Sequence, residues 1–177
     1  MAGNIGIDES NHGRYPGIFV AVYSNNLGDI VKQEKELPKI RGKANYNDVL
    51  CGRDFKYILF PKEYKKILAP SDFGLIAFSE FILHFKNLER AIIDGEVKES
   101  VLKEVEKVKY PNALPIIKVI PKADINYRLV NMADYMANML HREYSKHKKI
   151  TDETLLKNLI TPQIEHYIAV VSRIKRK

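Results

Sequence analysis

Several acidic residues stand at or just beyond the ends of apolar segments in this sequence. Asp8 and Glu9 follow one such segment, Asp94 ends a second, and Asp124 lies four residues beyond Ile120. Strands that end in carboxylates can bring these groups together at one edge of a sheet, although they are far apart in the chain. Carboxylate oxygens select Mg²⁺ or Mn²⁺, and two such ions about 4 Å apart can activate a water and stabilise the leaving oxygen in phosphodiester hydrolysis. The pattern therefore predicts metal-dependent nuclease chemistry.

Each of these acids also has an ordinary structural interpretation. Asp94 precedes Gly95, a pair that is common in turns, and Asp124 has the residue type of a helix N-cap. An Asp-Glu pair recurs at residues 152–153, where it suits the first turn of a helix. The hypothesis of a metal site therefore rests on the set of acids rather than on any single member.

The first part of the chain is expected to form three antiparallel strands in a row. We expect these strands at residues 4–8, 18–24 and 30–37, with a turn at residues 25–29 and a loop at residues 38–54. Residues of the first strand alternate with period two, so that Ile5 and Ile7 share one face, and Gly6 and Asp8 share the other. Asp8 then stands at the end of this strand.

Strands and helices alternate in the second half of the chain. Strands are expected at residues 57–60, 90–94 and 115–120, and helices at residues 71–85, 98–109, 127–146 and after Pro162, the first of them capped by Ser71. The helix at 127–146 has an apolar face and a second face with Asn131, Asp134, Asn138 and His141. Antiparallel strands followed by βαβ units predict an α/β domain whose mixed sheet is flanked by helices and is parallel in its second half.

Length and composition describe one globular domain. The 177 residues, 45% of them hydrophobic, suit a single domain at 1–177 with a basic helical extension at about 148–177. The longest apolar stretch has six residues, whereas a membrane span needs roughly 18. The start of the chain has no signal-peptide pattern, so we expect a cytoplasmic protein without membrane contact. Cys51 is the only cysteine, which excludes an intramolecular disulfide and a thiolate metal cage.

The net charge of +7 favours a polyanionic partner. Residues 142–177 contain nine basic and four acidic residues, which accounts for +5 of this total. The 38–54 loop adds Lys39, Arg41 and Lys43, interleaved with Tyr46, which could contact the backbone of a nucleic acid. For the C-terminal excess, a solvated helix and tail is the alternative to phosphate contact.

Other chemistries lack their sequence signatures. Ser10 and His12 stand beside acids, but no G-x-S-x-G motif is present to form a nucleophile elbow. The glycine-rich motifs of P-loop and Rossmann nucleotide-binding proteins are absent, and no two histidines have the i, i+4 spacing of a zinc hydrolase.

Two segments resemble ribonuclease HII. Residues 5–10 read I-G-I-D-E-S and precede Gly13 and Gly17, similar to the G-I-D-E-A-G-R-G signature of that family. Residues 122–137, followed by H-R-E at 141–143, are similar to its K-A-D-x-x-Y/F-P-V-V-x-A-A-S-I-x-A-K-V-x-R-D segment, and residues 91–94 occupy the place of the strand that ends in its third acid. The resemblance covers residues 4–143. It implies a ribonuclease H fold, with metal-binding and catalytic carboxylates at Asp8, Glu9, Asp94 and Asp124.

The chain departs from that family in several motifs. Asn11-His12-Gly13 stands where the family has the G-R-G that senses a ribose 2′-hydroxyl, and no counterpart of D-S-K-K-L or of the C-terminal G-Y-P-S-D is present. Ala133-Asp134 replaces A-S, which is similar to uncharacterised ribonuclease H-fold proteins with an I-D-E-S start and a late A-D helix. By that resemblance Asp134 would be a further metal ligand, and a solvent-exposed helical acid is the alternative.

These observations predict a nuclease that uses Mg²⁺ or Mn²⁺ to hydrolyse RNA, above all in RNA–DNA hybrids, and leaves a 3′-hydroxyl. The residues expected to contact the nucleic acid are Gly13, Arg14, Lys39, Arg41, Lys43 and Lys122. One alternative is a nucleic-acid-binding module of the same fold that has lost hydrolysis. Another is a small-molecule phosphoesterase on the same scaffold.

Overall fold

A computed structural model of the 177-residue chain describes residues 2–10, 15–41, 44–107 and 114–175. Its centre is a five-stranded mixed sheet with the strand order β3-β2-β1-β4-β5. The strands are β1 (Gly3–Ser10), β2 (Gly17–Ser24), β3 (Asp54–Phe60), β4 (Leu88–Asp94) and β5 (Ile116–Ile120). β2 is antiparallel to both of its neighbours, β1 and β3, whereas β4 lies parallel to β1 and β5 parallel to β4. The expected α/β fold with a mixed sheet is confirmed.

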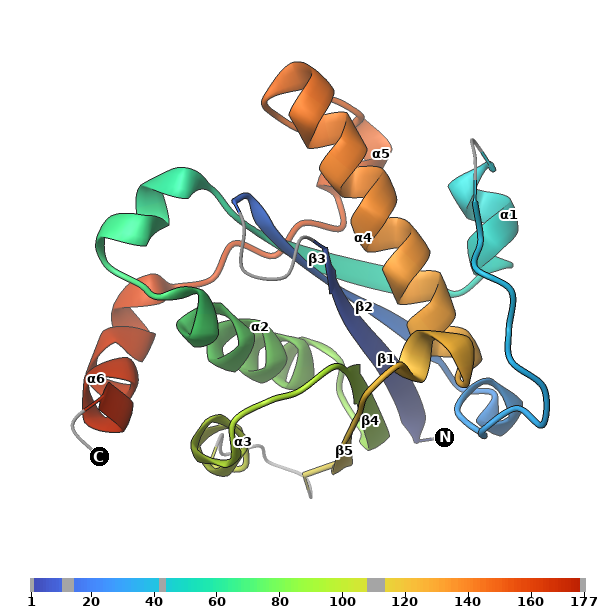
Figure 1. Ribbon diagram of the computed structural model, residues 1–177, viewed down its shortest axis with the longest axis horizontal. Helices are drawn as coiled ribbons and strands as arrows, with labels where there is room; N and C mark the ends of the chain where they lie inside the picture. Colours follow the sequence, from blue (N-terminus) through green and yellow to red (C-terminus); the bar gives the residue numbers. More distant parts are fainter. Residues whose placement is uncertain (1, 11–14, 42–43, 108–113, 176–177) are drawn as a thin grey trace.

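Helices cover both faces of the sheet (Figure 1). One face packs against α2 (Pro70–His84), α3 (Glu99–Val105) and α6 (Ile164–Lys175). The other packs against α4 (Arg128–His147), with α1 (Tyr46–Leu50) and α5 (Glu153–Leu156) beside it. The short 3₁₀ helices are η1 (Leu27–Asp29), η2 (Lys62–Lys66) and η3 (Ala123–Ile125). No helix in the described part of the chain is both long and apolar enough to cross a bilayer.

The third antiparallel strand is β3, and the prediction of a strand at residues 30–37 was wrong. That segment is polar, and two of its backbone N–H groups bond elsewhere: Gln33 donates to Asn126 O at 2.8 Å and Leu37 to Ile125 O at 2.7 Å. β3 instead buries apolar residues on both faces of the sheet, including Phe55 and Ile58. The apolar segment therefore pairs with β2, while the polar one runs past η3.

Smaller differences concern helix boundaries. Ser71 is not the N-cap of α2, because this helix begins at Pro70, whose missing N–H suits the first helical position. The Asp72 carboxylate accepts the Ala69 N–H at 2.7 Å and completes the cap. The 38–54 segment contains the short helix α1 and is not a loop throughout. The predicted helix at 98–109 is observed as α3, and its expected end lies partly outside the described residues.

Helix α4 lies directly on the central strand β1. A Cβ atom on Gly6 would come within 2.6 Å of the Leu129 carbonyl carbon and of the Val130 backbone nitrogen. The absence of a side chain at Gly6 therefore allows the first turn of α4 to approach the strand closely. Leu129, Val130 and Ala133 are fully buried in this contact. The packing fixes Asp134, one position after Ala133, over the end of β1.

Candidate functional site

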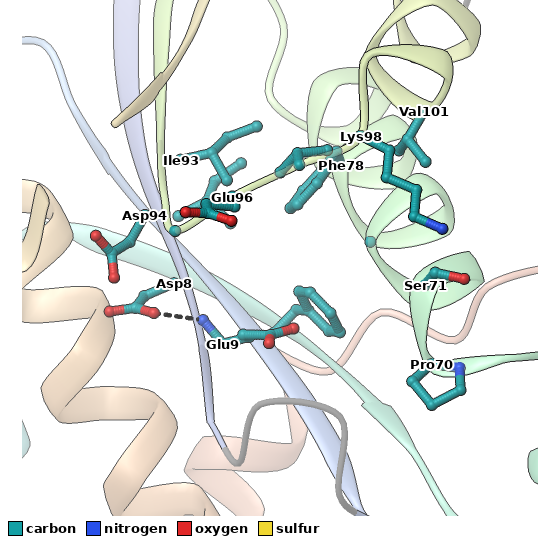
Figure 2. Close-up of a pocket in the computed structure, with 15 residues that line it drawn as sticks. Asp8, Glu9, Pro70, Ser71, Phe78, Ile93, Asp94, Glu96, Lys98 and Val101 are labelled. Carbon is teal, nitrogen blue, oxygen red and sulfur yellow. Dashed lines mark hydrogen bonds between the residues drawn. The ribbon is translucent and has the colours of Figure 1, made fainter. Parts of the chain in front are cut away.

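Asp8 and Asp94 lie side by side at the carboxyl ends of the parallel strands β1 and β4. The register pairs Ile7 with Ile93, so the two aspartates are the next residues along neighbouring strands. Both side chains point toward α4 (Figure 2). Asp8 is only 4% exposed, and its Oδ1 accepts the Glu9 backbone N–H at 2.7 Å. The sequence prediction that these two acids meet is confirmed.

Asp124 and Asp134 approach the same place from two further elements. Asp124 lies in η3, is 6% exposed and follows Ala123, whose backbone N–H donates to Asp94 Oδ1. Asp134 is half-buried on α4. Asp8, Asp94, Asp124 and Asp134 are hereafter called the acid cluster, in which four elements distant in sequence contribute one aspartate each.

Burial and the proximity of these carboxyls to one another raise the pKa values of several of them. Burial raises the pKa of Asp8 from its ordinary 3.8 to about 9, and repulsion from Asp94, Asp134 and Asp124 adds to the effect. Burial likewise raises the pKa of Asp94 and of Asp134, with further repulsion from Asp124 on both. A group of acids that cannot all ionise together is an arrangement that a bound cation would stabilise.

A lysine enters the acid cluster from the 31–41 segment. Lys39 Nζ lies 3.2 Å from Asp124 Oδ2, and the pKa of Lys39 is raised by its hydrogen bond and attraction to Asp124, and by attraction to Asp134 and Asp8. The Asn131 side-chain amide holds this arrangement by donating to Pro38 O at 3.3 Å and to Asp124 O at 2.8 Å. The sequence indicated a basic loop here, but it gave no signal that Lys39 would face carboxylates.

Glu9 does not share the face of Asp8. Consecutive strand residues point to opposite faces, and Glu9 pairs with Phe19 on the side of the sheet that faces α2. Figure 2 shows its side chain directed away from Asp8 and Asp94, into a pocket. Glu9 therefore lies at the same strand end as the acid cluster but on the opposite face. The place beside Asp8 that the sequence predicted for Glu9 is taken by Asp134.

The donor chemistry of the acid cluster suits a hard divalent cation, because it offers several carboxylate oxygens with surplus negative charge. Within the described ranges, no three Asp, Glu, His or Cys side chains already have the spacing of ligands to one ion. Lys39 forms an ion pair with the cluster through Asp124. The residue types and electrostatics fit a metal.

A basic groove runs along α4 beside Asp134. It has a volume of about 360 Å³ and is lined by Lys39, Arg41, Asp134, Asn138, His141 and Arg142, among others. Lys122 is exposed just before η3. The other expected nucleic-acid contacts, Gly13, Arg14 and Lys43, lie outside the described residues. Arg142 was absent from the predicted contacts, although it follows Asp134 and Asn138 at helical spacing (i, i+4, i+8) and the periodicity could have indicated it.

A second pocket opens on the other side of the strand ends and is called the side pocket (Figure 2). Its volume is about 320 Å³, and it lies between the ends of β1 and β4 and the helices α2 and α3. Its lining includes Asp8, Glu9, Phe19, Phe78, Asp94 and Glu96. Sequence reasoning missed this pocket, because its walls come from five elements whose apolar residues look like ordinary core positions.

Comparison with solved structures places this architecture among ribonuclease H-type folds. A chain in the structure of the PCNA–ribonuclease HII complex from Archaeoglobus fulgidus superposes with a TM-score of 0.55 at 18% identity, over 94% of this chain and 89% of that one. The ribonuclease H2 of Pyrococcus horikoshii gives a TM-score of 0.61 at 15% identity, over 82% and 75% of the two chains.

A Bst ribonuclease HIII variant gives a TM-score of 0.52 at 15% identity, over 81% of this chain and 56% of that chain. The sequence matches no protein-family model, and no curated protein sequence matches it. The protein therefore has a ribonuclease H-like α/β fold. Within that class its fold is similar to those of ribonucleases HII and HIII, as the resemblance in sequence motifs implied.

Proposed function

We propose that this protein is a divalent-metal-dependent nuclease of ribonuclease H type that hydrolyses RNA phosphodiesters, above all in RNA–DNA hybrids. The observation that carries the proposal is the convergence of Asp8, Asp94, Asp124 and Asp134 from four separate elements. Burial, together with repulsion among these acids, raises the pKa of Asp8 to about 9, a perturbation that is typical of functional sites. The likeness to ribonuclease HII folds supports the same conclusion.

The acid cluster would hold Mg²⁺ or Mn²⁺ without Glu9, because the Glu9 side chain points into the pocket on the opposite face. The metal supplies water activation and stabilisation of the departing 3′ oxygen. Asp8 is the central ligand, because Asp94, Asp124 and Asp134 all act on it. The Ala123 N–H fixes the Asp94 carboxylate, so this side chain is oriented before any ligand binds.

Basic residues beside the cluster would hold the nucleic acid. Lys39 lies at the junction between the acid cluster and the basic groove, where its ammonium can pair with a phosphate oxygen instead of Asp124. Arg41 and Arg142 continue the positive surface along the groove. Gly13, Arg14, Lys43 and Lys122 are further proposed contacts, and the net charge of +7 supports association with a polyanion.

One observation favours a second candidate, a nucleic-acid-binding module without hydrolysis. The Lys39–Asp124 ion pair already places one positive charge in the acid cluster, where a metal would otherwise supply it. In that case the aspartates and Lys39 would form a structural network, and the basic groove alone would be functional.

An assay of metal-dependent cleavage separates the two candidates. Labelled RNA–DNA hybrid, single-stranded RNA and double-stranded DNA are incubated with the protein and Mg²⁺ or Mn²⁺. We expect cleavage of the RNA strand to a 3′-hydroxyl product, with a loss of at least roughly 100-fold in Asp8→Asn. Asp54→Asn, at an exposed position on β3, is the matched control and should retain activity. Salt-sensitive binding without metal-dependent turnover would reject the nuclease and favour the binding module.

A further inference from the structure

The side pocket has an apolar floor and an acidic rim. Phe19 and Phe78 contribute to its walls and are 3% and 4% exposed, and their rings meet edge to face with centroids 6.0 Å apart. The carboxylates of Glu9 and Glu96 and the ammonium of Lys98 stand around the opening (Figure 2). A flat apolar group with hydrogen-bond donors on its edge has the chemistry that such a pocket selects.

The side pocket and the acid cluster lie on opposite faces of the sheet and meet at the ends of β1 and β4. Asp8 and Asp94 line the pocket with their strand ends while their carboxyls point toward α4. The pocket also lies beyond the carboxyl ends of the parallel neighbours β1 and β4. Ligands of open α/β sheets bind beyond the carboxyl ends of the strands. A ligand anchored at the acid cluster can therefore extend around the ends of β1 and β4 into the side pocket.

We propose that the side pocket receives the base of an unpaired nucleotide adjacent to the phosphodiester bond held at the acid cluster, and that it prefers a base with an exocyclic amino group. This inference rests on the proposed nuclease function. The volume of about 320 Å³ is at the small end of ligand pockets and suits a nucleobase rather than a base pair. Phosphate at the acid cluster and base in the pocket then belong to one nucleotide or to its direct neighbour.

The rim determines the preference among bases. Carboxylates accept hydrogen bonds, so Glu9 and Glu96 pair with the amino groups of cytosine, adenine or guanine. Uracil presents two carbonyl oxygens and one N–H on its edge, and an oxygen facing a carboxylate is unfavourable. Lys98 adds one donor, which complements the ring-nitrogen or carbonyl acceptor beside the amino group.

The proposal also determines the form of the substrate. A base inside the side pocket is neither stacked nor paired, and unstacking costs least in single strands, at mismatches and at ends. Cleavage should therefore be fastest next to an unpaired nucleotide, and a continuous hybrid should be cut preferentially where one ribonucleotide is mismatched.

The test uses short RNA oligonucleotides that differ at one position beside the cleaved bond. The position carries cytosine, uracil or an abasic residue, and cleavage is measured with wild type and with two variants that fill the pocket, Val97→Trp and Gly74→Met. We expect the abasic substrate to be cut roughly tenfold more slowly by wild type, because one base in an aromatic site contributes that much binding. The filled variants should lose this difference, whereas Leu83→Phe on the exposed side of α2 should retain it.

A binding readout keeps the inference separate from the nuclease proposal. An oligonucleotide with 2-aminopurine at the same position is titrated with Asp8→Asn, and its fluorescence should change with this variant but not with Asp8→Asn combined with Val97→Trp. Two results would overturn the inference. One is an equal rate of cleavage for the abasic and the base-containing substrates. The other is the same 2-aminopurine fluorescence change with Asp8→Asn and with Asp8→Asn combined with Val97→Trp. A pocket-dependent 2-aminopurine signal without metal-dependent cleavage of any substrate would support the pocket and reject the nuclease.

Discussion

Lys39 Nζ lies 3.2 Å from Asp124 Oδ2, at the boundary between four carboxylates and a basic groove. The Lys39 side chain is 55% exposed whereas that of Asp124 is 9% exposed, so the lysine can leave the pair and the carboxylate cannot follow it. Partly exposed ion pairs contribute little to stability. The pair is therefore suited to exchange of partners, in which a divalent cation binds the Asp124 carboxylate and a phosphate binds the Lys39 ammonium.

Replacement of Lys39 by methionine tests this exchange. Lys39→Met keeps an unbranched side chain but removes the charge that competes with a metal. Mn²⁺ should then bind roughly threefold to tenfold more tightly, which is the effect expected from removing one partly screened charge at short range. Titration calorimetry with Mn²⁺ measures the affinity, and Lys65→Met on η2 is the control. An unchanged Mn²⁺ affinity would show that Lys39 does not compete at the metal site.

The raised pKa of Asp8 predicts that the stability of the folded protein falls as the pH rises. Its pKa is about 9 in the folded protein against 3.8 ordinarily, so the folded state retains a proton that the unfolded state has released at neutral pH. The resulting stabilisation is complete below about pH 4 and is lost progressively as pH approaches 9. Asp8→Asn keeps the shape of the side chain and removes the loss of stability with rising pH. The Tm of this variant should therefore exceed that of wild type at pH 8 and approach it near pH 4.

Calorimetric melting curves at several pH values measure this effect. The expected difference at pH 8 is several degrees, because ~1 kcal/mol corresponds to about 2–4 °C in a domain of this size. Added Mg²⁺ should raise the Tm of wild type at pH 8 and leave that of Asp8→Asn nearly unchanged. A pH-independent difference between the two proteins would contradict the raised pKa, and Asp54→Asn controls for the loss of a carboxylate in general.

The close approach of α4 to β1 predicts that one methyl group added at Gly6 lowers the free energy of unfolding substantially. Gly6→Ala places a Cβ within 2.6 Å of backbone atoms of Leu129 and Val130, which cannot rotate away. We expect a loss of about 2–3 kcal/mol in the free energy of unfolding, measured by urea denaturation. Gly17→Ala is the matched control, since the nearest atoms to its Cβ are side-chain atoms, the Phe73 ring at 3.3 Å and the Phe60 Cβ at 3.8 Å. Equal costs at both glycines would contradict the contact.

The sequence predicted those parts of the site that depend on local periodicity. Alternation along β1 placed Asp8 opposite Ile5 and Ile7, and an apolar run placed Asp94 at the end of β4. Because β1 and β4 are parallel neighbours, these local facts sufficed to bring the two acids together. The long helix was likewise visible in its apolar stripe, and Asp134 was recognised on its polar face.

The features that failed depend on contacts between distant segments. Residues 30–37 could pair as a strand or run beside η3, and only competition with the more apolar β3 decides between these outcomes. The same path carries Lys39 to Asp124, so an incorrect strand concealed the ion pair as well. Glu9 was grouped with Asp8 because they are adjacent, whereas strand geometry directs adjacent side chains to opposite faces.

The basic groove predicts the salt dependence of nucleic-acid binding. Arg41 and Arg142 line it from two segments, and each phosphate contact that they make releases counterions when a hybrid binds. Removing both side chains should lower the slope of log K against log[salt] by roughly two. The measurement uses the Arg41→Ala/Arg142→Ala double variant in the Asp8→Asn background, so that hydrolysis does not interfere, with fluorescence anisotropy at several salt concentrations.

Lys65→Ala/Lys66→Ala removes the same total charge from η2, outside the lining of the groove, and provides the control for net charge. If long-range attraction alone held the nucleic acid, both double variants would weaken binding equally and leave similar slopes. A loss of slope in the groove variant alone would instead mean that the phosphates contact α4 directly. Because Asp134 lines the same groove, that result would also place the bound strand within reach of the acid cluster.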